Sequence, residues 1–261
     1  MHKALWVGKT GLEAQDIALA TISNNMANAS STGFKKDRAV FQDLIYQIQR
    51  QPGAQESQST QLPSGLQLGT GVRTVGTQKI FTQGDLQVTE QPLDLAINGR
   101  GFFQIILPDG NIGYTRDGTF HISADGQVVT ASGNPLEPGI EIPDQTKTIT
   151  IGKDGIVSVV TANDTLPVEI GNIEVVDFVN PAGLQAIGNN LFLETASSGE
   201  PQAGVPSLDG FGAILQGALE NSNVTIVEEM VDMITTQRAY EMNSKVVSTA
   251  DQMLGFVTSN L

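Results

Sequence analysis

Apolar residues recur every seven positions at the N-terminal end of the chain, at Leu5, Leu12, Leu19 and Met26. A seven-residue repeat is typical of a helix that packs along a supercoiled partner. The segment 223–261 shows the same tendency, with apolar side chains at three-and-four spacing: Tyr240, Val247, Ala250, Leu254, Val257 and Leu261. Neither stretch contains proline, so each can form a continuous helix. Two such helices predict one helical module built from both ends of the chain.

The apolar arcs of these two helices are wider than one antiparallel partner can cover. This width predicts contacts with further helices from other subunits. A two-helix pair packed against the chain's own sheet is the alternative. Glu228 and Glu229 fall in the early turns of the C-terminal helix, where carboxylates favour the helix dipole. Being adjacent, they should point to different faces.

The middle of the chain, from about 72 to 207, has the pattern of β-structure. Asp-Gly pairs at 109–110, 117–118, 125–126 and 154–155 alternate with short β-branched and aromatic runs. Asp-Gly between such runs is a strong hairpin signal, so we predict a β-meander. The predicted fold class is α+β, with paired N- and C-terminal helices forming a coiled-coil-like module and a central, mostly antiparallel β domain.

The expected domain organisation has three parts. Residues 1–33 and 222–261 form the helical domain, residues 34–84 an extended connecting region, and residues 85–221 the β-rich domain. The segment 49–71 within the connecting region is rich in Gln and Ser and contains two prolines. That composition indicates a linker or a long loop, which is either disordered or functional.

Composition excludes most catalytic and nucleic-acid-binding classes. The chain has 14 Lys and Arg against 28 Asp and Glu, a net charge of −14, whereas phosphate binding needs clustered cations. Cysteine is absent and only two histidines occur, so we expect no thiolate or histidine metal site, no cofactor and no enzyme activity. A hydrolase using two of the central carboxylates and a secreted β-rich adhesin are the rival readings from other classes.

No targeting or membrane segment is expected. The apolar run at 4–7 is too short for the core of a signal peptide. No stretch approaches the roughly 20 apolar residues that span a bilayer. We therefore expect a cytosolic chain or one exported without a cleaved signal.

Sequence motifs at both ends identify a family resemblance. Asn24-Asn25-Met26-Ala27-Asn28, followed by Ser31-Thr32-Gly33-Phe34-Lys35-Lys36, resembles the N-terminal signature of the bacterial flagellar rod and hook axial proteins. The segments 227–234 and 237–245 resemble the matching C-terminal signature. The motif residues are Asn24, Asn25, Asn28, Gly33, Phe34 and Lys35. Ser31 stands where the family usually has Thr, and the hydroxyl is kept.

This resemblance implies a subunit of a helical tube, with the terminal helices lining a central export channel. Leu5, Leu12, Leu19, Met26, Tyr240, Val247 and Leu254 would pack these helices. The implied partners are further copies of the chain, the proximal rod and hook proteins, the surrounding basal-body rings and the flagellar type III export machinery, with no nucleic acid. The implied location is the flagellar basal body in the periplasm.

The resemblance also gives the Gln-rich segment a role. Gln51, Pro52 and Gly53 through Pro63 resemble an inserted stretch that makes the tube straight and stiff. Composition alone would favour a flexible linker, and here we follow the resemblance. The nearest alternative to a subunit of this stiff tube is a hook or proximal rod protein of the same family.

Overall fold

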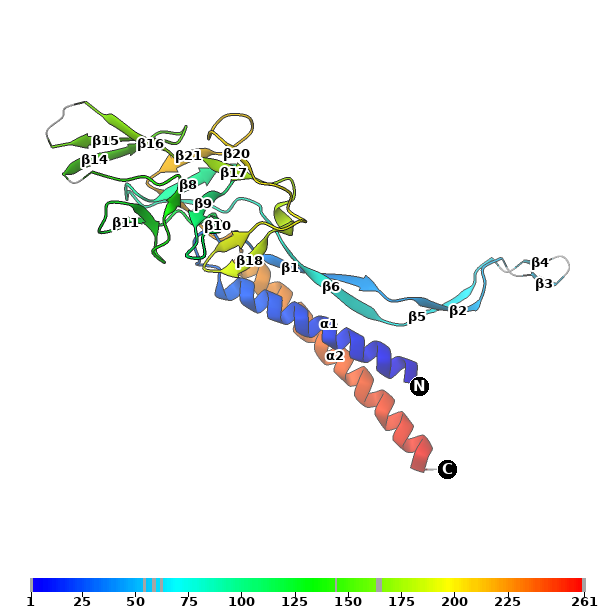
Figure 1. The fold of residues 1–261 in the computed structure, drawn as a ribbon. Coiled ribbons are helices and arrows are strands. Elements are labelled where there is room, and N and C mark those ends of the chain that lie inside the picture. The colour runs from blue at the N-terminus through cyan, green and yellow to red at the C-terminus, as the bar shows by residue number, and fades with distance from the viewer. Residues whose placement is uncertain are drawn as a thin grey trace. The chain divides into compact units, whose positions relative to one another are not determined.

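A computed structural model gives the fold of the chain (Figure 1). It describes residues 2–53, 55–57, 60–61, 63–143, 145–162 and 166–259. The chain divides into two compact units. The helical unit comprises Met1–Ala27, Asp37–Gln78 and Thr225–Leu261, and the β unit comprises Asn28–Lys36 and Lys79–Val224. The three-part division expected from the sequence stays a prediction.

The helical unit contains the two long helices that the apolar repeats predict, α1 (His2–Ala27) and α2 (Ile226–Ser259). They run antiparallel, so that the first turns of α1 lie beside the second half of α2 (Figure 1). Glu228 and Glu229 lie in the first turn of α2. As predicted, they face different sides, because Glu229 is buried and Glu228 is exposed.

A two-stranded arm completes the helical unit. β1 (Asp37–Asp43) pairs with β6 (Val72–Lys79), β2 (Tyr46–Arg50) with β5 (Leu66–Gly69), and β3 (Gln55–Ser57) with β4 (Thr60–Gln61). The linker that composition alone indicates for 49–71 is therefore not what the described residues form. Backbone pairing, such as Tyr46 opposite Gly69 and Gln47 opposite Leu68, does not depend on hydrophobic side chains and tolerates a Gln-rich sequence. Ala54 and Leu62 of the predicted insert, and Leu261 of the C-terminal repeat, lie outside the described residues.

The β unit is built from short antiparallel strands, as predicted for the central region. Its largest sheet has the order β13 (Leu136–Glu137), β9 (Phe103–Ile106), β10 (Ile112–Thr115), β19 (Leu191–Leu193) and β18 (Gln185–Gly188). A second sheet contains β14 (Thr146–Ile151), β15 (Ile156–Thr161) and β16 (Val168–Asn172). The remaining strands form four pairs: β11 (Phe120–Ile122) with β12 (Val128–Thr130), β17 (Val175–Asp177) with β20 (Gln202–Gly204), β21 (Ala213–Gln216) with β8 (Leu95–Asn98), and β22 (Ala218–Glu220) with β7 (Leu86–Val88). A 3-10 turn, Pro181–Gly183, precedes β18.

Three of the four Asp-Gly pairs named above, those within residues 72–207, turn hairpins. Gly110, Gly126 and Gly155 have φ of 82°, 80° and 85° and join β9 to β10, β11 to β12, and β14 to β15. Asp117-Gly118 does not, because β10 pairs with β9 and β19 whereas β11 pairs with β12. There the Asp117 carboxylate accepts hydrogen bonds from the backbone N–H and the hydroxyl of Thr119, at 3.1 and 2.9 Å. The regular meander predicted from the spacing is thus interrupted after β10.

Two hydrophobic clusters form the core of the β unit. The larger joins β8, β9 and β14–β16 through buried residues such as Ile97, Phe103 and Val157. The smaller is aromatic and contains Phe102, Tyr114, Val176, Phe178, Leu184 and Phe192. Tyr114 and Phe178 meet edge to face with 4.8 Å between ring centroids, a favourable geometry for two aromatic quadrupoles. Burial raises the pKa of Tyr114 to about 12.

Candidate assembly site

Glycines allow α1 and α2 to approach closely. A Cβ placed on Gly8 would lie 2.6 Å from Cγ2 of Val247, and one on Gly11 would lie 3.0 Å from Nδ2 of Asn243. Real Cβ atoms essentially never pack at 2.6 Å, so a larger residue at Gly8 would displace Val247 or separate the helices, whereas the 3.0 Å at Gly11 is a tight contact that Asn243 would have to accommodate. The close approach of the helices at this point therefore depends on the absence of a side chain at Gly8.

A buried polar contact continues the same antiparallel register at the other end of the pair. Asn25, which is 2% exposed, donates from Nδ2 to Oε2 of Glu229, which is 4% exposed, over 3.2 Å. The Asn25 side chain also exchanges two hydrogen bonds of 2.9 Å with the backbone of Asp37 at the start of β1. One amide thus joins α1, α2 and the arm within the helical unit.

The predicted packing residues are distributed along both helices. Leu5, Leu12, Leu19, Met26, Val247 and Leu254 are half-buried, whereas Tyr240 is 41% exposed. Their role in assembly stays a prediction. Sequence reasoning missed Gly8, Gly11 and Asn243, although a second repeat of small or polar residues was available one position ahead of the leucines: Ala4, Gly11, Ala18 and Asn25.

Much of the apolar surface of α2 is left exposed by α1. The side chains more than 50% exposed include Val227, Val231, Met242, Val246, Met253 and Phe256. This surface agrees with the expectation that one antiparallel partner cannot cover the apolar arc. An exposed apolar surface of this extent marks an interaction site in a folded protein.

Inside the β unit, a buried ion cluster involves the motif residue Lys35. Lys35 Nζ lies 2.6 Å from Oε1 of Glu220, and Arg116 NH1 lies 3.2 Å from Oε2 of the same carboxylate. The backbone N–H of Gly84 also donates to Glu220, at 2.9 Å, and Lys35 donates to the carbonyl of Thr82 at 2.7 Å. We call Lys35, Glu220 and Arg116 the charge cluster.

Burial dominates the electrostatics of the charge cluster. Desolvation lowers the pKa of Lys35, and the nearby Glu220 carboxylate partly opposes this shift. Desolvation likewise lowers the pKa of Arg116, again opposed by Glu220. Arg116 donates to the carbonyls of Ile97 and Gly99, while its buried Nε has no hydrogen-bond partner among the described residues. One carboxylate therefore compensates two buried cations.

Hydrogen bonds around the charge cluster hold together three segments that lie next to the unit boundaries in sequence. Lys36 N–H donates to Oδ1 of Asn223 at 2.7 Å, and Asn223 Nδ2 donates to the carbonyl of Ile80 at 2.8 Å. Ile80 N–H donates in turn to the carbonyl of Lys36 at 2.9 Å. Residues 33–36, 80–84 and 220–223 are thus tied to one another within the β unit.

The other motif residues build the turn that leads to Lys35. Gly33 has φ of 67°, and a Cβ there would lie 2.7 Å from the backbone of Arg116 and Asp117, so glycine is required on both counts. Gly33 N–H donates to the carbonyl of Glu220 at 2.7 Å. Phe34 stacks under Nζ of Lys79, 5.2 Å from the ring centroid, and Asn28 accepts a hydrogen bond from Ser31. Asn24 lies exposed on α1.

The residues of the predicted rigidity insert lie on the arm. Gln51, Pro52, Gly53 and Pro63 are all exposed. Gly53 has φ of 77° with no atom near its missing Cβ, whereas a Cβ on Gly65 would lie 2.5 Å from the carbonyl oxygen of Arg50 and 2.7 Å from Pro52. The two strands of the arm therefore approach each other closely beside Pro52. Whether this segment stiffens an assembly stays a prediction.

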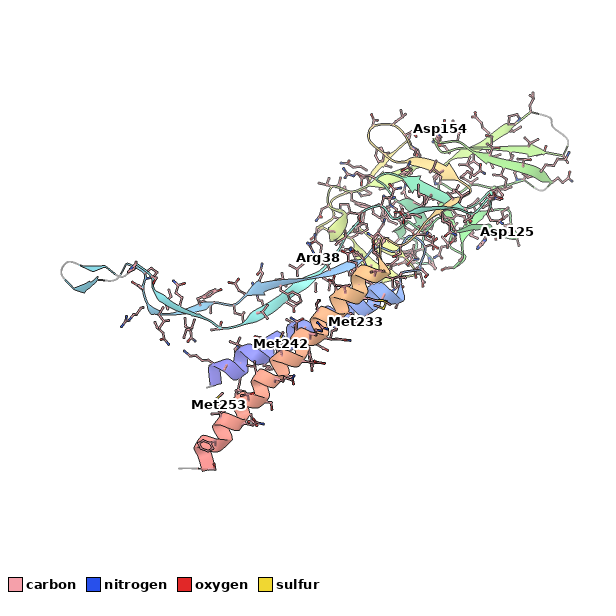
Figure 2. All side chains as sticks on the ribbon, turned by 180° about the vertical axis from the view of Figure 1, so that it is seen from behind. Arg38, Asp125, Asp154, Met233, Met242 and Met253 are labelled. Atoms are coloured by element: carbon pink, nitrogen blue, oxygen red, sulfur yellow. The ribbon has the colours of Figure 1, made fainter. Side chains whose placement is uncertain are left out.

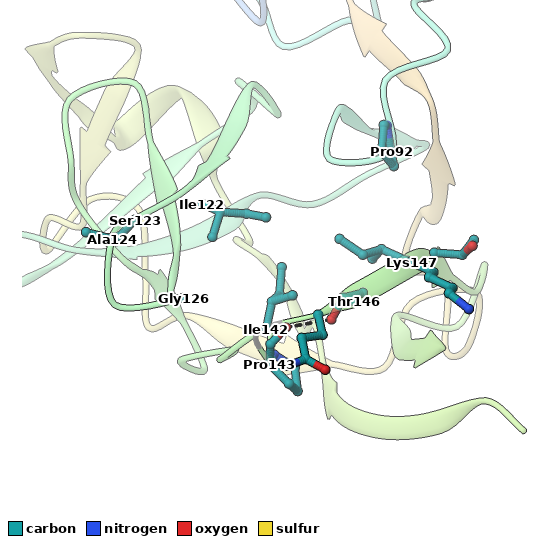
Figure 3. A pocket seen from close by; sticks show the side chains of 12 residues that line it. Pro92, Ile122, Ser123, Ala124, Gly126, Ile142, Pro143, Thr146 and Lys147 are labelled. Atoms are coloured by element: carbon teal, nitrogen blue, oxygen red, sulfur yellow. Dashed lines mark hydrogen bonds between the residues drawn. The ribbon is translucent and has the colours of Figure 1, made fainter. Parts of the chain in front are cut away.

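One groove of the β unit is poor in ionisable side chains. A groove of about 400 Å³ in the β unit is lined by twelve residues, of which Lys147 alone is ionisable (Figure 3). His121 is exposed on β11. Within the described ranges, no three His, Asp or Glu side chains are grouped to hold a metal ion. Neither helix, over the part that the structure describes, is long and apolar enough to cross a bilayer.

Known protein families match the chain at both ends and in the middle. Residues 5–35 match the family described as flagella basal body rod protein. Residues 96–159 match the flagellar hook protein FlgE/F/G D1 domain, and residues 215–261 match the flagellar basal body rod FlgEFG protein C-terminal family. The matched ends contain Asn25, Lys35, Glu220 and Glu229, which form the buried contacts described above.

Curated relatives match over nearly their whole length. The flagellar basal-body rod protein FlgG of Buchnera aphidicola subsp. Schizaphis graminum is 55% identical over 97% of this chain and 98% of its own. FlgG of Borreliella burgdorferi is 49% identical over 100% of this chain and 99% of its own. The flagellar hook-basal body complex protein FlhP of Bacillus subtilis is 34% identical over 99% of both chains. With matches at this identity along the full chain, this protein belongs to the flagellar basal-body rod protein family.

Proposed function

We propose that the chain is a structural subunit of the flagellar distal rod, the part of the basal-body axis next to the hook. Copies of it would assemble into a straight, rigid helical tube that transmits torque from motor to hook and encloses the export channel. The observation that carries this proposal is the full-length identity of up to 55% to proteins named FlgG. The match covers both terminal helices and the arm between them, so it is not confined to a shared domain.

The helical unit supplies a physical basis for self-assembly. We infer that α1 and α2 pair in a coiled-coil-like manner through Gly8, Gly11 and Asn25, and that exposed α2 residues such as Val246 contact further copies. Burial of a side chain of this size contributes about 1.5 to 3 kcal/mol when complete. The role is structural, in agreement with the names of the relatives, and no enzyme activity is proposed.

Partners and location follow from the family resemblance. The tube would join the proximal rod at one end and the hook at the other, and would turn inside the surrounding basal-body rings in the periplasm. Subunits would leave through the flagellar type III export machinery without a cleaved signal. A net charge of −14 gives no support for a nucleic-acid partner.

Tube formation by the purified chain tests the self-assembly. Tyr240→Asp places a charge on an exposed apolar position of α2 and should abolish tubes in electron micrographs while helix content by circular dichroism is kept. Ser248→Asp, at an exposed polar position about 80° from Tyr240 and about 120° from Met242 around the same helix, is the matched control and should assemble. Leu12→Asp with Leu254→Asp should also block assembly. Tubes of normal yield from Tyr240→Asp would count against this surface, and absence of tubes from the unaltered chain would count against the function.

The arm provides a second test, which separates a distal rod from a hook. Deletion of residues 51–63 removes the predicted rigidity insert. The expected result is a curved or flexible tube. Straight tubes of unchanged stiffness would show that residues 51–63 are not needed for rigidity.

A further inference from the structure

Sulfur is distributed unevenly along the chain. Cysteine is absent, and four of the six methionines lie on α2, at Met230, Met233, Met242 and Met253. Met242 and Met253 are 63% and 52% exposed, and both are marked along α2 in Figure 2. Met233 and Met26, by contrast, are half-buried. Among the methionines that the structure describes, the two most exposed, Met242 and Met253, therefore both lie on α2.

Met242 and Met253 share a face with Val246, which is 52% exposed. At about 100° per residue, these three side chains fall within about 40° of one another around α2. Asn243 and Val247, which meet Gly11 and Gly8 of α1, lie about 100° or more from Met242 on the same count. The face that carries the two methionines is thus separate from the face that α1 covers.

We propose that Met242 and Met253 are oxidation sites whose thioether state controls the docking of a second copy of this chain on α2. This inference rests on the self-assembly proposed above. The oxidant is hydrogen peroxide: the thioether sulfur attacks one peroxide oxygen, an S–O bond forms as the O–O bond breaks, and the second oxygen leaves as hydroxide, which takes the proton from the sulfur-bound oxygen and becomes water. Sulfur is oxidised by two electrons and the peroxide is reduced.

The change in polarity explains why docking would fail. A methionine thioether is apolar and flexible, which suits a surface that must fit a neighbouring copy. A sulfoxide adds a strong hydrogen-bond acceptor at the same place, and burying an acceptor without a donor is unfavourable. A reduction in association of about tenfold for each sulfoxide at the contact is expected. Once a second copy covers the face, the same methionines become protected from peroxide.

Met230 offers a matched control on the same helix. It is 50% exposed, close to Met253, yet lies about 120° from Met242 around the helix. Its oxidation should therefore proceed at a similar rate without the same effect on docking. Leucine is the substitution of choice because it keeps an apolar side chain of similar volume and cannot form a sulfoxide.

The experiment treats the full chain with hydrogen peroxide before assembly and compares it with the M242L/M253L and M230L variants. Peptide mass spectrometry locates the sulfoxides, and sedimentation with electron microscopy gives the concentration at which tubes form. That concentration should rise tenfold or more for the unaltered chain and for M230L, and change less than twofold for M242L/M253L. Methionine sulfoxide reductase should restore assembly, and preformed tubes should show lower oxidation at Met242 and Met253 than free subunits.

Two results would overturn the inference. Equal loss of assembly by M242L/M253L and the unaltered chain would place the effect elsewhere. Tubes that form equally well from chain oxidised at Met242 and Met253 would show that these sulfoxides do not affect docking. Both results leave the proposed function intact, whereas failure of the untreated chain to form tubes would count against self-assembly itself.

Discussion

Asn25 in α1 donates a buried hydrogen bond of 3.2 Å to the carboxylate of Glu229 in α2, across 204 residues of sequence. The same amide holds the backbone of Asp37, where the arm begins. A polar group buried at a helix contact specifies one register, because any slip leaves it without partners. The relationship therefore fixes how the two ends of the chain pair within the helical unit.

Loss of this amide should destabilise the helix pair. Asn25→Ala removes three hydrogen bonds and leaves Glu229 and the Asp37 backbone to find other partners, so we expect a loss of about 1 to 3 kcal/mol. The measurement is urea unfolding followed by circular dichroism at 222 nm. Ser23→Ala, at an exposed position of the same helix, should change stability by about 0.5 kcal/mol or less. Equal midpoints for the two variants would contradict the role assigned to Asn25.

Glycine at position 8 should be more stabilising than alanine despite its poorer helix propensity. Gly8→Ala places a Cβ 2.6 Å from Val247, and overpacking costs about 1 to 3 kcal/mol, against a propensity gain of about 1 kcal/mol. Gly255→Ala is the matched control, since no atom lies within 4 Å of its Cβ position, and it should raise helix stability. A double-mutant cycle with Val247→Ala should show a coupling above about 0.5 kcal/mol. A stabilising Gly8→Ala would refute the close contact.

The charge cluster should be far more sensitive than a surface ion pair. Glu220→Gln leaves the buried cations of Lys35 and Arg116 without their shared counter-charge, a change that costs about 3 to 5 kcal/mol. Near-UV circular dichroism during urea unfolding reports on the β unit through its aromatic cluster. Glu13→Gln breaks the ion pair with Lys9. The Lys9 and Glu13 side chains are 61% and 60% exposed, so this loss should cost about 0.5 kcal/mol or less. Similar effects of the two substitutions would mean that the cluster is accessible to water.

Stability of the β unit should fall at alkaline pH because of Tyr114. Its pKa is raised to about 12 by burial, whereas the unfolded chain releases this proton near pH 10. Above pH 10 the unfolded state therefore binds fewer protons than the folded state, so the free energy of unfolding decreases as pH rises. The contribution is about 1 kcal/mol by pH 11. Tyr114→Phe should flatten this part of the pH profile, and an identical slope in both proteins would disprove the assignment.

Local patterns in the sequence predicted those features that are decided locally. The hairpins at Asp109-Gly110, Asp125-Gly126 and Asp154-Gly155 require only a glycine with positive φ after an aspartate, between two short strands. Asp117-Gly118 has the same letters, but the carbonyl of Leu95 occupies the space where a Gly118 side chain would lie. There the glycine serves a tertiary contact, which no local pattern distinguishes from a turn.

Long-range pairing explains what the sequence could not predict. The motif located Asn25 and Lys35, yet Glu220 as the partner of Lys35 lies 185 residues away, and one acidic residue among the 28 in the chain cannot be selected from sequence alone. The small-residue repeat containing Gly11 was hidden beside the more conspicuous leucine repeat. Strand pairing in the Gln-rich arm could not be predicted from composition, because the backbone hydrogen bonds that form it do not require particular side chains.

The charge cluster also determines when the β unit can be completed. A polypeptide that emerges N-terminus first presents Lys35 long before Glu220. Until residue 220 has emerged, burial of Lys35 would place an uncompensated cation in a dry interior, so closure of this region is strongly disfavoured. The 185-residue separation therefore acts as a delay, which ties the burial of Lys35 to the arrival of the segment that leads into α2.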